Sequence, residues 1–443
     1  MSSDIAWCLC KINRLNYTFI HKRCKNRAIL FFLSLQQLIY PIEHMKTKRI
    51  LFYLSMALLS MTGCKPGAHP AEFAGSDDSL KQDSVEIMYV GTYTEKEDSV
   101  IGKATGIYVY ELNTSSGKLA YVSSSPHTVN PSYLVADNEN NLLYAVNETA
   151  NKDKPGGSIS AFRLLNGGRQ LDFINTVSSQ GNYPCYVSLD KTRKWVMCAN
   201  YGSGTVSVLP VRDSGSLGEA TMVHQHAGKG PKSQQDAAHA HFIFQNPANS
   251  LIYSCDLGVD TIYIYKLNTA TGKLIHSGHN YATMPGAGPR HLAFHPSMNL
   301  VYVVNELNGT IEVMKVDSLT GALRRIQVIS TLDPGMKTDA SCADIHLTPS
   351  GKFLYASNRG NVNNLAIYQV DPQTGILTLI GHQPVKGKTP RSFIIDPTGK
   401  FLLVANQDTG NVVTFRIDQE TGKLEDTGIE TIIPFPVCLK FLL

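Results

Sequence analysis

Basic and acidic side chains that can do acid–base and anion-binding chemistry stand at the edges of apolar strand patterns in the middle of this chain. His241 and Arg290 lie where two such patterns start, and Glu306 and Arg359 follow directly after two others end. A carboxylate or an imidazole can activate water as a general base. A guanidinium can hold a developing oxyanion, or bind a phosphate or carboxylate with two donors. These residues need a fold that gathers distant strand ends in one place.

A repeat of about fifty residues supplies that fold. Each unit opens on proline or a polar substitute, enters an apolar strand, and then gives a second strand ending in Asn or Asp. The openings are 46 to 56 residues apart, as in propeller blades, at Pro131, Pro184, Ala240, Pro289, Ala343, Pro390 and Pro436.

A third strand in each unit ends at a turn whose chemistry is repeated. Asn or Asp opens the turn, and a glycine four residues later supplies the positive φ that reverses the chain, as in residues 113–119, 268–274, 317–323, 371–377 and 418–424. With the strand before the next opening, each unit has four strands. The segment 437–441 is a lone strand, which we expect to pair with residues 86–92 and close the ring. The predicted fold is all-β, a seven-bladed β-propeller with four antiparallel strands per blade, over residues 86–443.

The middle repeats resemble the lactonase family, which includes the 6-phosphogluconolactonases and the fungal carboxymuconate lactonizing enzymes. The matching stretches are His239-Ala-His241, Asp256 to Asp260, Gly288-Pro-Arg-His291 with His295-Pro296, Asn305-Glu306-Leu307, Asp344-Ile345, Asn358-Arg359-Gly360, Pro390-Arg391 and Asn406-Gln407. The resemblance covers about residues 88–441. It implies a seven-bladed propeller that hydrolyses a lactone. We expect no cofactor.

The resemblance assigns His241, Arg290, Glu306 and Arg359 to the active site. Lactone hydrolysis needs a base and cationic oxyanion partners; Glu306 or His241 can be the base, and Arg290 or Arg359 the partner. We expect substrate contacts from a second set of residues: His239, His291, Asp344, Arg391, Asn358 and Gln407.

Structural roles compete with several of these assignments. Arg290, Arg359 and Arg391 can instead pair with Asp344 or Glu306 between blades. His239 and His295 suit turn capping at strand starts. Asp256 and Asp260 can face a cation at the channel mouth, but the carboxylates are scattered and the histidines lack zinc spacing, so no metal is predicted. The other cysteines after Cys64 lie mostly inside apolar strand patterns, which predicts buried free thiols at Cys185, Cys198, Cys255, Cys342 and Cys438.

The N-terminal segment predicts export. Residues 45–63 combine Lys46, Lys48 and Arg49 with an apolar run too short to span a bilayer, as in a secretory signal peptide. Cys64 after Gly63 resembles a bacterial lipobox cysteine, although Met61 stands where leucine is usual. We therefore expect a lipidated, membrane-anchored protein facing the periplasm or exterior, with residues 64–85 as a tether and residues 1–44 as an upstream extension.

Charge excludes nucleic acid as a partner. The net charge of +4 comes from the start of the chain, because residues 64–443 carry 31 Lys or Arg against 34 Asp or Glu. The expected partner is a small, anionic lactone, and the only expected membrane contact is the lipid anchor. Export argues against a cytoplasmic sugar phosphate as substrate and favours another aldonolactone or a carboxylated lactone. A non-catalytic binding scaffold and a carboxymuconate-type enzyme are the alternatives, and the sequence leaves the oligomeric state open.

Overall fold

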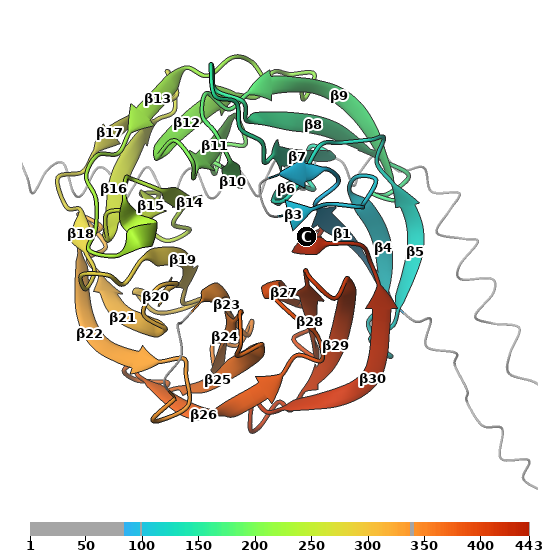
Figure 1. Cartoon of the computed structure of the whole chain (residues 1–443), viewed down its shortest axis with the longest axis vertical. Helices are drawn as coiled ribbons and strands as arrows, with labels where there is room; N and C mark the ends of the chain where they lie inside the picture. Colours follow the sequence, from blue (N-terminus) through green and yellow to red (C-terminus); the bar gives the residue numbers. More distant parts are fainter. Residues whose placement is uncertain (1–83, 98–99, 337–340, 443) are drawn as a thin grey trace, which may run out of the picture. The chain divides into compact units, whose positions relative to one another are not determined.

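Seven four-stranded antiparallel sheets follow one another around a ring in the computed structural model (Figure 1). The structure describes residues 84–442 except 98–99 and 337–340, so the predictions for residues 1–83, including Cys64, lie outside the described residues. The predicted fold class is confirmed.

Each blade runs from an inner strand at the channel to an outer strand at the circumference. In six blades the four strands follow one another in the chain, whereas blade 1 takes its inner strand from the C-terminus. Blade 1 is β31 (Pro436–Phe441), β1 (Val85–Thr92), β4 (Tyr108–Asn113) and β5 (Leu119–Ser124). Blade 2 is β6 (Leu134–Asp137), β7 (Leu142–Asn147), β8 (Ser158–Leu165) and β9 (Gln170–Ser178). Blade 3 is β10 (Pro184–Leu189), β11 (Trp195–Asn200), β12 (Thr205–Pro210) and β13 (Met222–Gln225).

The remaining blades repeat this order. Blade 4 is β14 (Ala240–Gln245), β15 (Ile252–Asp256), β16 (Thr261–Asn268) and β17 (Lys273–His276), with β18 (Tyr281–Ala282) also paired to β16. Blade 5 is β19 (Pro289–Phe294), β20 (Leu300–Asn305), β21 (Thr310–Val316) and β22 (Leu323–Ser330). Blade 6 is β23 (Cys342–Leu347), β24 (Phe353–Asn358), β25 (Asn364–Val370) and β26 (Leu377–Pro384). Blade 7 is β27 (Pro390–Ile395), β28 (Phe401–Asn406), β29 (Asn411–Ile417) and β30 (Leu424–Ile432).

Two short elements lie outside the blades. The hairpin β2 (Lys96–Glu97) and β3 (Val100–Ile101) follows β1, and the 3₁₀ turn η1 (Ser233–Gln235) lies between blades 3 and 4. No helix in the described residues is long and apolar enough to cross a membrane.

The two ends of the propeller meet in blade 1, as predicted. Strand β31 pairs antiparallel with β1 in the register Met88 to Phe441 and Val90 to Leu439. Because the first blade takes its inner strand from the C-terminus, the ring closes through backbone hydrogen bonds and leaves no open blade edge at the seam.

The tyrosines of the second strands hold neighbouring blades together. In five blades the hydroxyl donates to a glycine carbonyl in the next blade's turn, for example from Tyr302 to Gly375 at 3.0 Å. In blade 3, Trp195 takes this role and donates to Thr269 O. The turn glycines have positive φ, 75° at Gly321 and 73° at Gly375, as the turn pattern predicts. The five cysteines among the described residues are free and buried, also as predicted.

Candidate active site

In five of the seven blades, a β-bulge at the start of the inner strand frees one residue from the ladder near the channel. In blades 3, 4, 5 and 7 the register skips one residue directly after the first residue of the strand, as between Pro289 and His291, and β31 skips Val437 in the same way. A bulged residue is freed from the ladder and its side chain is re-aimed. We call the equivalent residues of the seven blades the mouth ring: Val437, Ser132, Cys185, His241, Arg290, Ala343 and Arg391. All of them except Ala343 line one narrow cavity in the channel.

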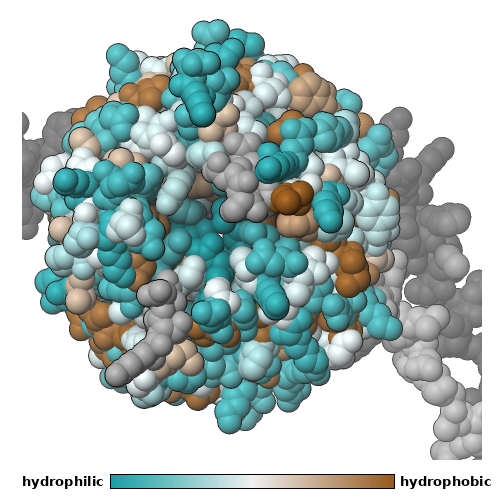
Figure 2. Space-filling model, viewed as in Figure 1, coloured by the Kyte–Doolittle hydropathy of each residue, from teal (hydrophilic) through white to brown (hydrophobic). Residues whose placement is uncertain are grey.

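A second ring surrounds the first. In every blade, one backbone hydrogen bond ties the end of the second strand to the start of the inner strand. The residue after the second strand donates its N–H to the carbonyl of the residue two positions before the mouth-ring residue. In blade 5, for example, Glu306 N donates to Gly288 O at 2.8 Å, and Arg290 is the mouth-ring residue. We call these residues the rim ring: Tyr93, Glu148, Tyr201, Leu257, Glu306, Arg359 and Gln407. The two rings place residues from all seven blades at one mouth of the channel, where Figure 2 shows hydrophilic residues around the central hollow.

Glu306 joins two arginines from two blades. Its Oε2 lies 2.8 Å from Arg290 Nε, and its Oε1 lies 2.9 Å from Arg359 Nη2. Arg290 is 2% exposed and its Nη1 also donates to Ala343 O at 2.6 Å. Arg359 is fixed by the carbonyls of Ser341 and Cys342. Three of the four predicted catalytic side chains are therefore in one ion-pair cluster.

The charges in this cluster set the protonation states. Burial raises the pKa of Glu306, but the charges of Arg359, Arg290 and Arg391 outweigh burial and hold the pKa below its usual value. Burial, followed by the charge of Arg359, lowers the pKa of Arg290 to about 10, which still leaves it charged at neutral pH. The cluster is thus a carboxylate between two guanidinium cations.

His241 faces this cluster from blade 4. The side chain is buried and lines the same cavity as Arg290, and its Nδ1 has no hydrogen-bond partner. Burial, together with the charges of Arg290 and His291, lowers the pKa of His241 well below its usual value. A neutral imidazole with a free ring nitrogen can accept a proton at neutral pH.

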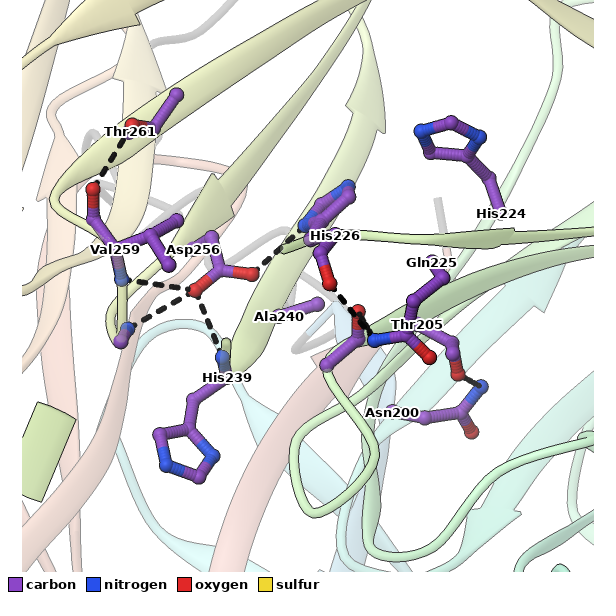
Figure 3. Close-up of polar contacts among 12 residues, drawn as sticks. Asn200, Thr205, His224, Gln225, His226, His239, Ala240, Asp256, Val259 and Thr261 are labelled. Carbon is purple, nitrogen blue, oxygen red and sulfur yellow. Dashed lines mark hydrogen bonds and ion pairs between the residues drawn. The ribbon is translucent and has the colours of Figure 1, made fainter. Parts of the chain in front are cut away.

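A buried His–Asp pair anchors the segment that carries His241. Figure 3 shows the Asp256 carboxylate between the His226 ring and the backbone of His239 and Val259. His226 Nδ1 donates to Asp256 Oδ2 at 2.8 Å, and the backbone N–H of His239 donates to Oδ1 at 2.7 Å. His226 Nε2 contacts Tyr265 OH at 2.8 Å. Asp256 thereby fixes the chain two residues before His241.

The last residue of the second strand, Asp256 in blade 4, makes a different contact in most other blades. Five second strands end in Asn, and in four of them the side-chain Nδ2 donates to a carbonyl of the segment entering the blade: Asn147 to Val129, Asn200 to Ser179, Asn358 to Thr331 and Asn406 to Val385. In blade 4 a carboxylate accepts from a histidine instead. Asn358, which is predicted to contact substrate, has its amide engaged with Thr331 and Asn364 and so shares this repeated structural role.

The other predicted substrate contacts divide into two groups. His291 and Asp344 line the cavity, with 3.0 Å between His291 Nδ1 and Asp344 Oδ1, and Asp344 also contacts His346 at 3.2 Å. His239 instead stacks on Tyr201, and its ring nitrogens contact Tyr201 O and Asp236. The His239 ring thus holds the loop, consistent with the structural alternative.

Arg391 does not form the predicted alternative pair with Asp344 or Glu306. It lines the cavity from blade 7, and its Nη2 lies 3.6 Å from Glu148 Oε1 of blade 2. Sequence reasoning missed Glu148. The available signal was its place directly after Asn147, which matches the place of Glu306 directly after Asn305.

The carboxylates considered as cation ligands are occupied by N–H donors. Asp260 accepts hydrogen bonds from Gln235, Gly286 N and Gly288 N, and Asp256 is bound as described above. Among the residues that the structure describes, no group of three or more His, Cys, Asp or Glu side chains is arranged to hold a metal ion. His295 caps its turn, as the structural alternative expects, because its Nδ1 accepts the backbone N–H groups of Ser297 and Met298.

The fold is a closed seven-bladed β-propeller that carries arginines, a carboxylate and a buried histidine at one mouth of its channel. The family model for the lactonase seven-bladed β-propellers matches residues 87–441, and the chain belongs to this family.

Relatives cover the same region. The 6-phosphogluconolactonase of Bacillus subtilis strain 168 is 37% identical over 357 residues, which is 80% of this chain and 98% of the relative. The 6-phosphogluconolactonase of Formosa agariphila is 35% identical over 78% of this chain and 96% of its own length. Among solved structures, the periplasmic gluconolactonase of Pseudomonas aeruginosa is 30% identical with a TM-score of 0.75, covering 81% of this chain and 99% of that one.

Proposed function

We propose that this protein is a lactone hydrolase that opens a sugar lactone to its acid, as the 6-phosphogluconolactonase names of its relatives indicate. The observation that carries the proposal is the Arg290–Glu306–Arg359 cluster next to the neutral His241. The cluster offers fixed cations where a carbonyl oxygen can become an oxyanion, and the histidine offers a base within the same mouth.

The reaction needs one water and returns every proton. A water oxygen attacks the lactone carbonyl while His241 takes a water proton, and the carbonyl oxygen becomes an oxyanion held by Arg290 and Arg359. The bond between the carbonyl carbon and the ring oxygen then breaks, and the ring oxygen takes a proton from His241 to become a hydroxyl. The product is a hydroxy acid, whose ionisation releases the proton that an assay can detect.

We assign the base to His241 and the positioning of both guanidinium groups to Glu306. Each Glu306 oxygen lies against a guanidinium, so Glu306 would have to break an ion pair to accept a proton. His241 Nδ1 has no partner to lose.

The mouth offers fixed guanidinium groups for the charge that develops during the reaction. The side chains of Arg290, Arg359 and Arg391 face Glu306 and Glu148 at the rim, and Asp344 lines the same cavity as Arg290 and Arg391. Because these three cations face three carboxylates, a neutral sugar lactone suits the mouth, and the oxyanion and the carboxylate of the product are the anions that the guanidinium groups can bind. Lys232 from the loop around η1 reaches Leu307 O, directly beside Glu306, and adds a further cation at the rim.

A lactone panel tests the proposal. Proton release is measured with 6-phosphogluconolactone, gluconolactone and muconolactone, and we expect turnover of at least one sugar lactone above that of muconolactone. Turnover of muconolactone alone would favour a carboxymuconate-type enzyme. No turnover of any lactone by the folded protein would favour a binding scaffold.

We also propose that the protein is exported and lipid-anchored at Cys64. The basic residues, the apolar run and the small residues before Cys64 support this placement. The periplasmic gluconolactonase of Pseudomonas aeruginosa shows a comparable fold at work outside the cytoplasm, as its name states. A periplasmic substrate is more readily an unphosphorylated aldonolactone than a sugar phosphate.

A further inference from the structure

Buried polar atoms without partners gather at the channel mouth. Within the described residues, ten buried side-chain N or O atoms have no hydrogen-bond partner, and five belong to the two rings. One of the five, Arg290 Nε, lies 2.8 Å from Glu306 Oε2 and is paired by charge. The other four are Ser132 Oγ, Glu148 Oε2, His241 Nδ1 and Gln407 Oε1. A buried polar group without a partner costs about 1–3 kcal/mol, so each of these atoms favours a ligand that satisfies it.

Three of these atoms lie on one side of the ring, away from the reactive cluster. Ser132 and Glu148 are neighbours in blade 2, because the N–H groups of both donate to Asn130 O. Gln407 and Arg391 are neighbours in blade 7 in the same way, through Thr389 O. Arg391 in turn lies 3.6 Å from Glu148. Blades 7, 1 and 2 are contiguous in the closed ring, whereas His241, Arg290, Glu306 and Arg359 belong to blades 4 to 6.

The unpartnered atoms on this side of the mouth are mainly hydrogen-bond acceptors. The Glu148 carboxylate is hydrogen-bonded by the Tyr93 hydroxyl and lies against Arg391, and its Oε2 is the acceptor without a partner. The Gln407 amide is oriented by its Nε2, which donates to Asp408 Oδ1 at 3.0 Å, so Oε1 is the atom left over. Ser132 Oγ can accept or donate. Ligand hydroxyls are the donors that suit such a set, and a ligand phosphate or carboxylate would be repelled by Glu148.

We infer that Ser132, Glu148 and Gln407 form a hydroxyl-binding subsite, which makes the substrate a polyhydroxylated lactone held with its carbonyl toward Arg290 and its hydroxyls toward blades 7 and 2. This inference rests on the proposed lactone hydrolysis. It separates sugar lactones from simple or carboxylated lactones, because a site built to bind hydroxyls leaves its buried acceptors unpaired when the hydroxyls are missing.

The test compares two six-membered lactones, gluconolactone with its hydroxyls and δ-valerolactone without them. The measured quantity is selectivity, the ratio of the two kcat/KM values. We expect wild type to prefer gluconolactone, and we expect Ser132→Ala, Glu148→Gln and Gln407→Met each to lower the selectivity about tenfold, the effect of losing one such hydrogen bond. Ser207→Ala is the matched control, since Ser207 also has a buried, unpartnered Oγ but lies in β12 outside the two rings, and it should leave the ratio as in wild type.

A binding measurement separates this inference from the proposed activity. By calorimetry, D-gluconate should bind wild type more tightly than hexanoate, which has the same carbon chain without hydroxyls, and the three variants should remove that preference. If wild type hydrolyses neither lactone but binds gluconate in this way, the proposed activity fails and the subsite stands. If wild type is active and all three folded variants keep both the selectivity and the gluconate preference, the subsite is wrong and the lactonase proposal remains.

Discussion

Arg290 is held from two sides, with 2.8 Å from its Nε to Glu306 Oε2 and 2.6 Å from its Nη1 to Ala343 O. One contact lies within blade 5 and the other crosses to blade 6. The guanidinium position is therefore fixed before any substrate arrives, which is the condition for stabilising a charge that appears only in the transition state.

We predict that Arg290→Lys lowers kcat on the order of 100 to 1,000-fold, because a lysine keeps the charge but cannot make both contacts and face the oxyanion as well. The measurement is steady-state lactone hydrolysis with circular dichroism as the folding check. Arg324→Lys, at an exposed position on the outer strand β22, is the control and should behave as wild type. A folded Arg290→Lys variant with wild-type turnover would place the oxyanion elsewhere.

His241→Gln and Glu306→Gln should have different kinetic effects. Loss of a general base costs about 10²- to 10⁴-fold, so His241→Gln should lower kcat with little change in KM. Glu306→Gln removes the charge that positions Arg290 and Arg359, so KM should rise together with a fall in kcat. The reverse pattern, a loss of kcat alone in Glu306→Gln and near-normal turnover in His241→Gln, would make Glu306 the base.

The repeat, and hence the fold, could be predicted from sequence because its signals are local. The turn that begins at Asp317 is specified within seven residues, and Asp317 Oδ1 accepts the N–H groups of Leu319 and Thr320 as such a turn requires. Strand ends at Asn305 and Asn358 were also placed correctly. Ring closure could also be predicted, because residues 437–441 form a single strand after the sixth complete repeat and residues 86–92 offer it a pairing partner.

Part of the site could be predicted, since the pairing of Arg290 and Arg359 with Glu306 was one of the alternatives that the sequence offered. Other contacts could not, because they depend on pairs far apart in the chain. Glu148 meets Arg391 across 243 positions, and only the closed ring brings blades 2 and 7 near each other. The structural role of Asn358 was not visible in the sequence for a related reason. Asn358 stands next to Arg359 in a stretch that matches the family, and only the folded blades show that its amide donates to a backbone carbonyl as those of Asn147 and Asn200 do.

Acid should destabilise the fold partly through His291. Burial, followed by the charge of Arg290, lowers the pKa of His291 to about 4 in the folded protein, against about 6.5 in an unfolded chain. Between these values the unfolded state binds a proton that the folded state does not, so the free energy of unfolding falls as pH drops from about 6.5 to 4. Burial raises the pKa of Asp344, but His346 and His291 outweigh burial and hold the pKa well below its usual value of 3.8. The free energy of unfolding should therefore fall further as the pH drops below about 3.8.

Urea unfolding at pH 7 and pH 5 measures this effect. The midpoint should be lower at pH 5 for wild type, and the difference should shrink in His291→Gln, which cannot take up the proton. His127→Gln, at an exposed position, is the control and should keep the wild-type difference. An unchanged pH dependence in His291→Gln would assign the acid sensitivity to other groups.

Membrane attachment should depend on a single thiol. Expressed from Met45, the wild-type protein should appear in the membrane fraction, and Cys64→Ala should release it because the acyl chain has no attachment point. Cys198→Ala, a change at a buried blade cysteine, is the control for altering a thiol elsewhere. If Cys64→Ala fractionates with the membrane as wild type does, the lipobox interpretation is wrong.

The His226–Asp256 pair should act as a unit that positions His241. Asp256→Asn removes the anionic acceptor of His226 Nδ1 and weakens the hold on His239 N–H, so it should lower the free energy of unfolding by about 1–3 kcal/mol and reduce kcat. His226→Ser leaves the buried Asp256 carboxylate without its side-chain donor and should lower the free energy of unfolding by a similar amount. The double variant recreates the Ser179–Asn200 pair of blade 3, in which the amide donates to a carbonyl.

A double-mutant cycle therefore measures the coupling, and we expect the double variant to lose at least about 1 kcal/mol less than the sum of the two single losses. Asn406→Asp is the matched control, because it introduces the same carboxylate in blade 7, where Val385 O and no histidine faces it, and it should destabilise the protein. Measuring kcat separates a positioning role from a purely structural one. If the pair positions His241, the double variant should recover part of the kcat that each single variant loses. Strictly additive losses in both stability and kcat would show that the two side chains act independently and do not position His241.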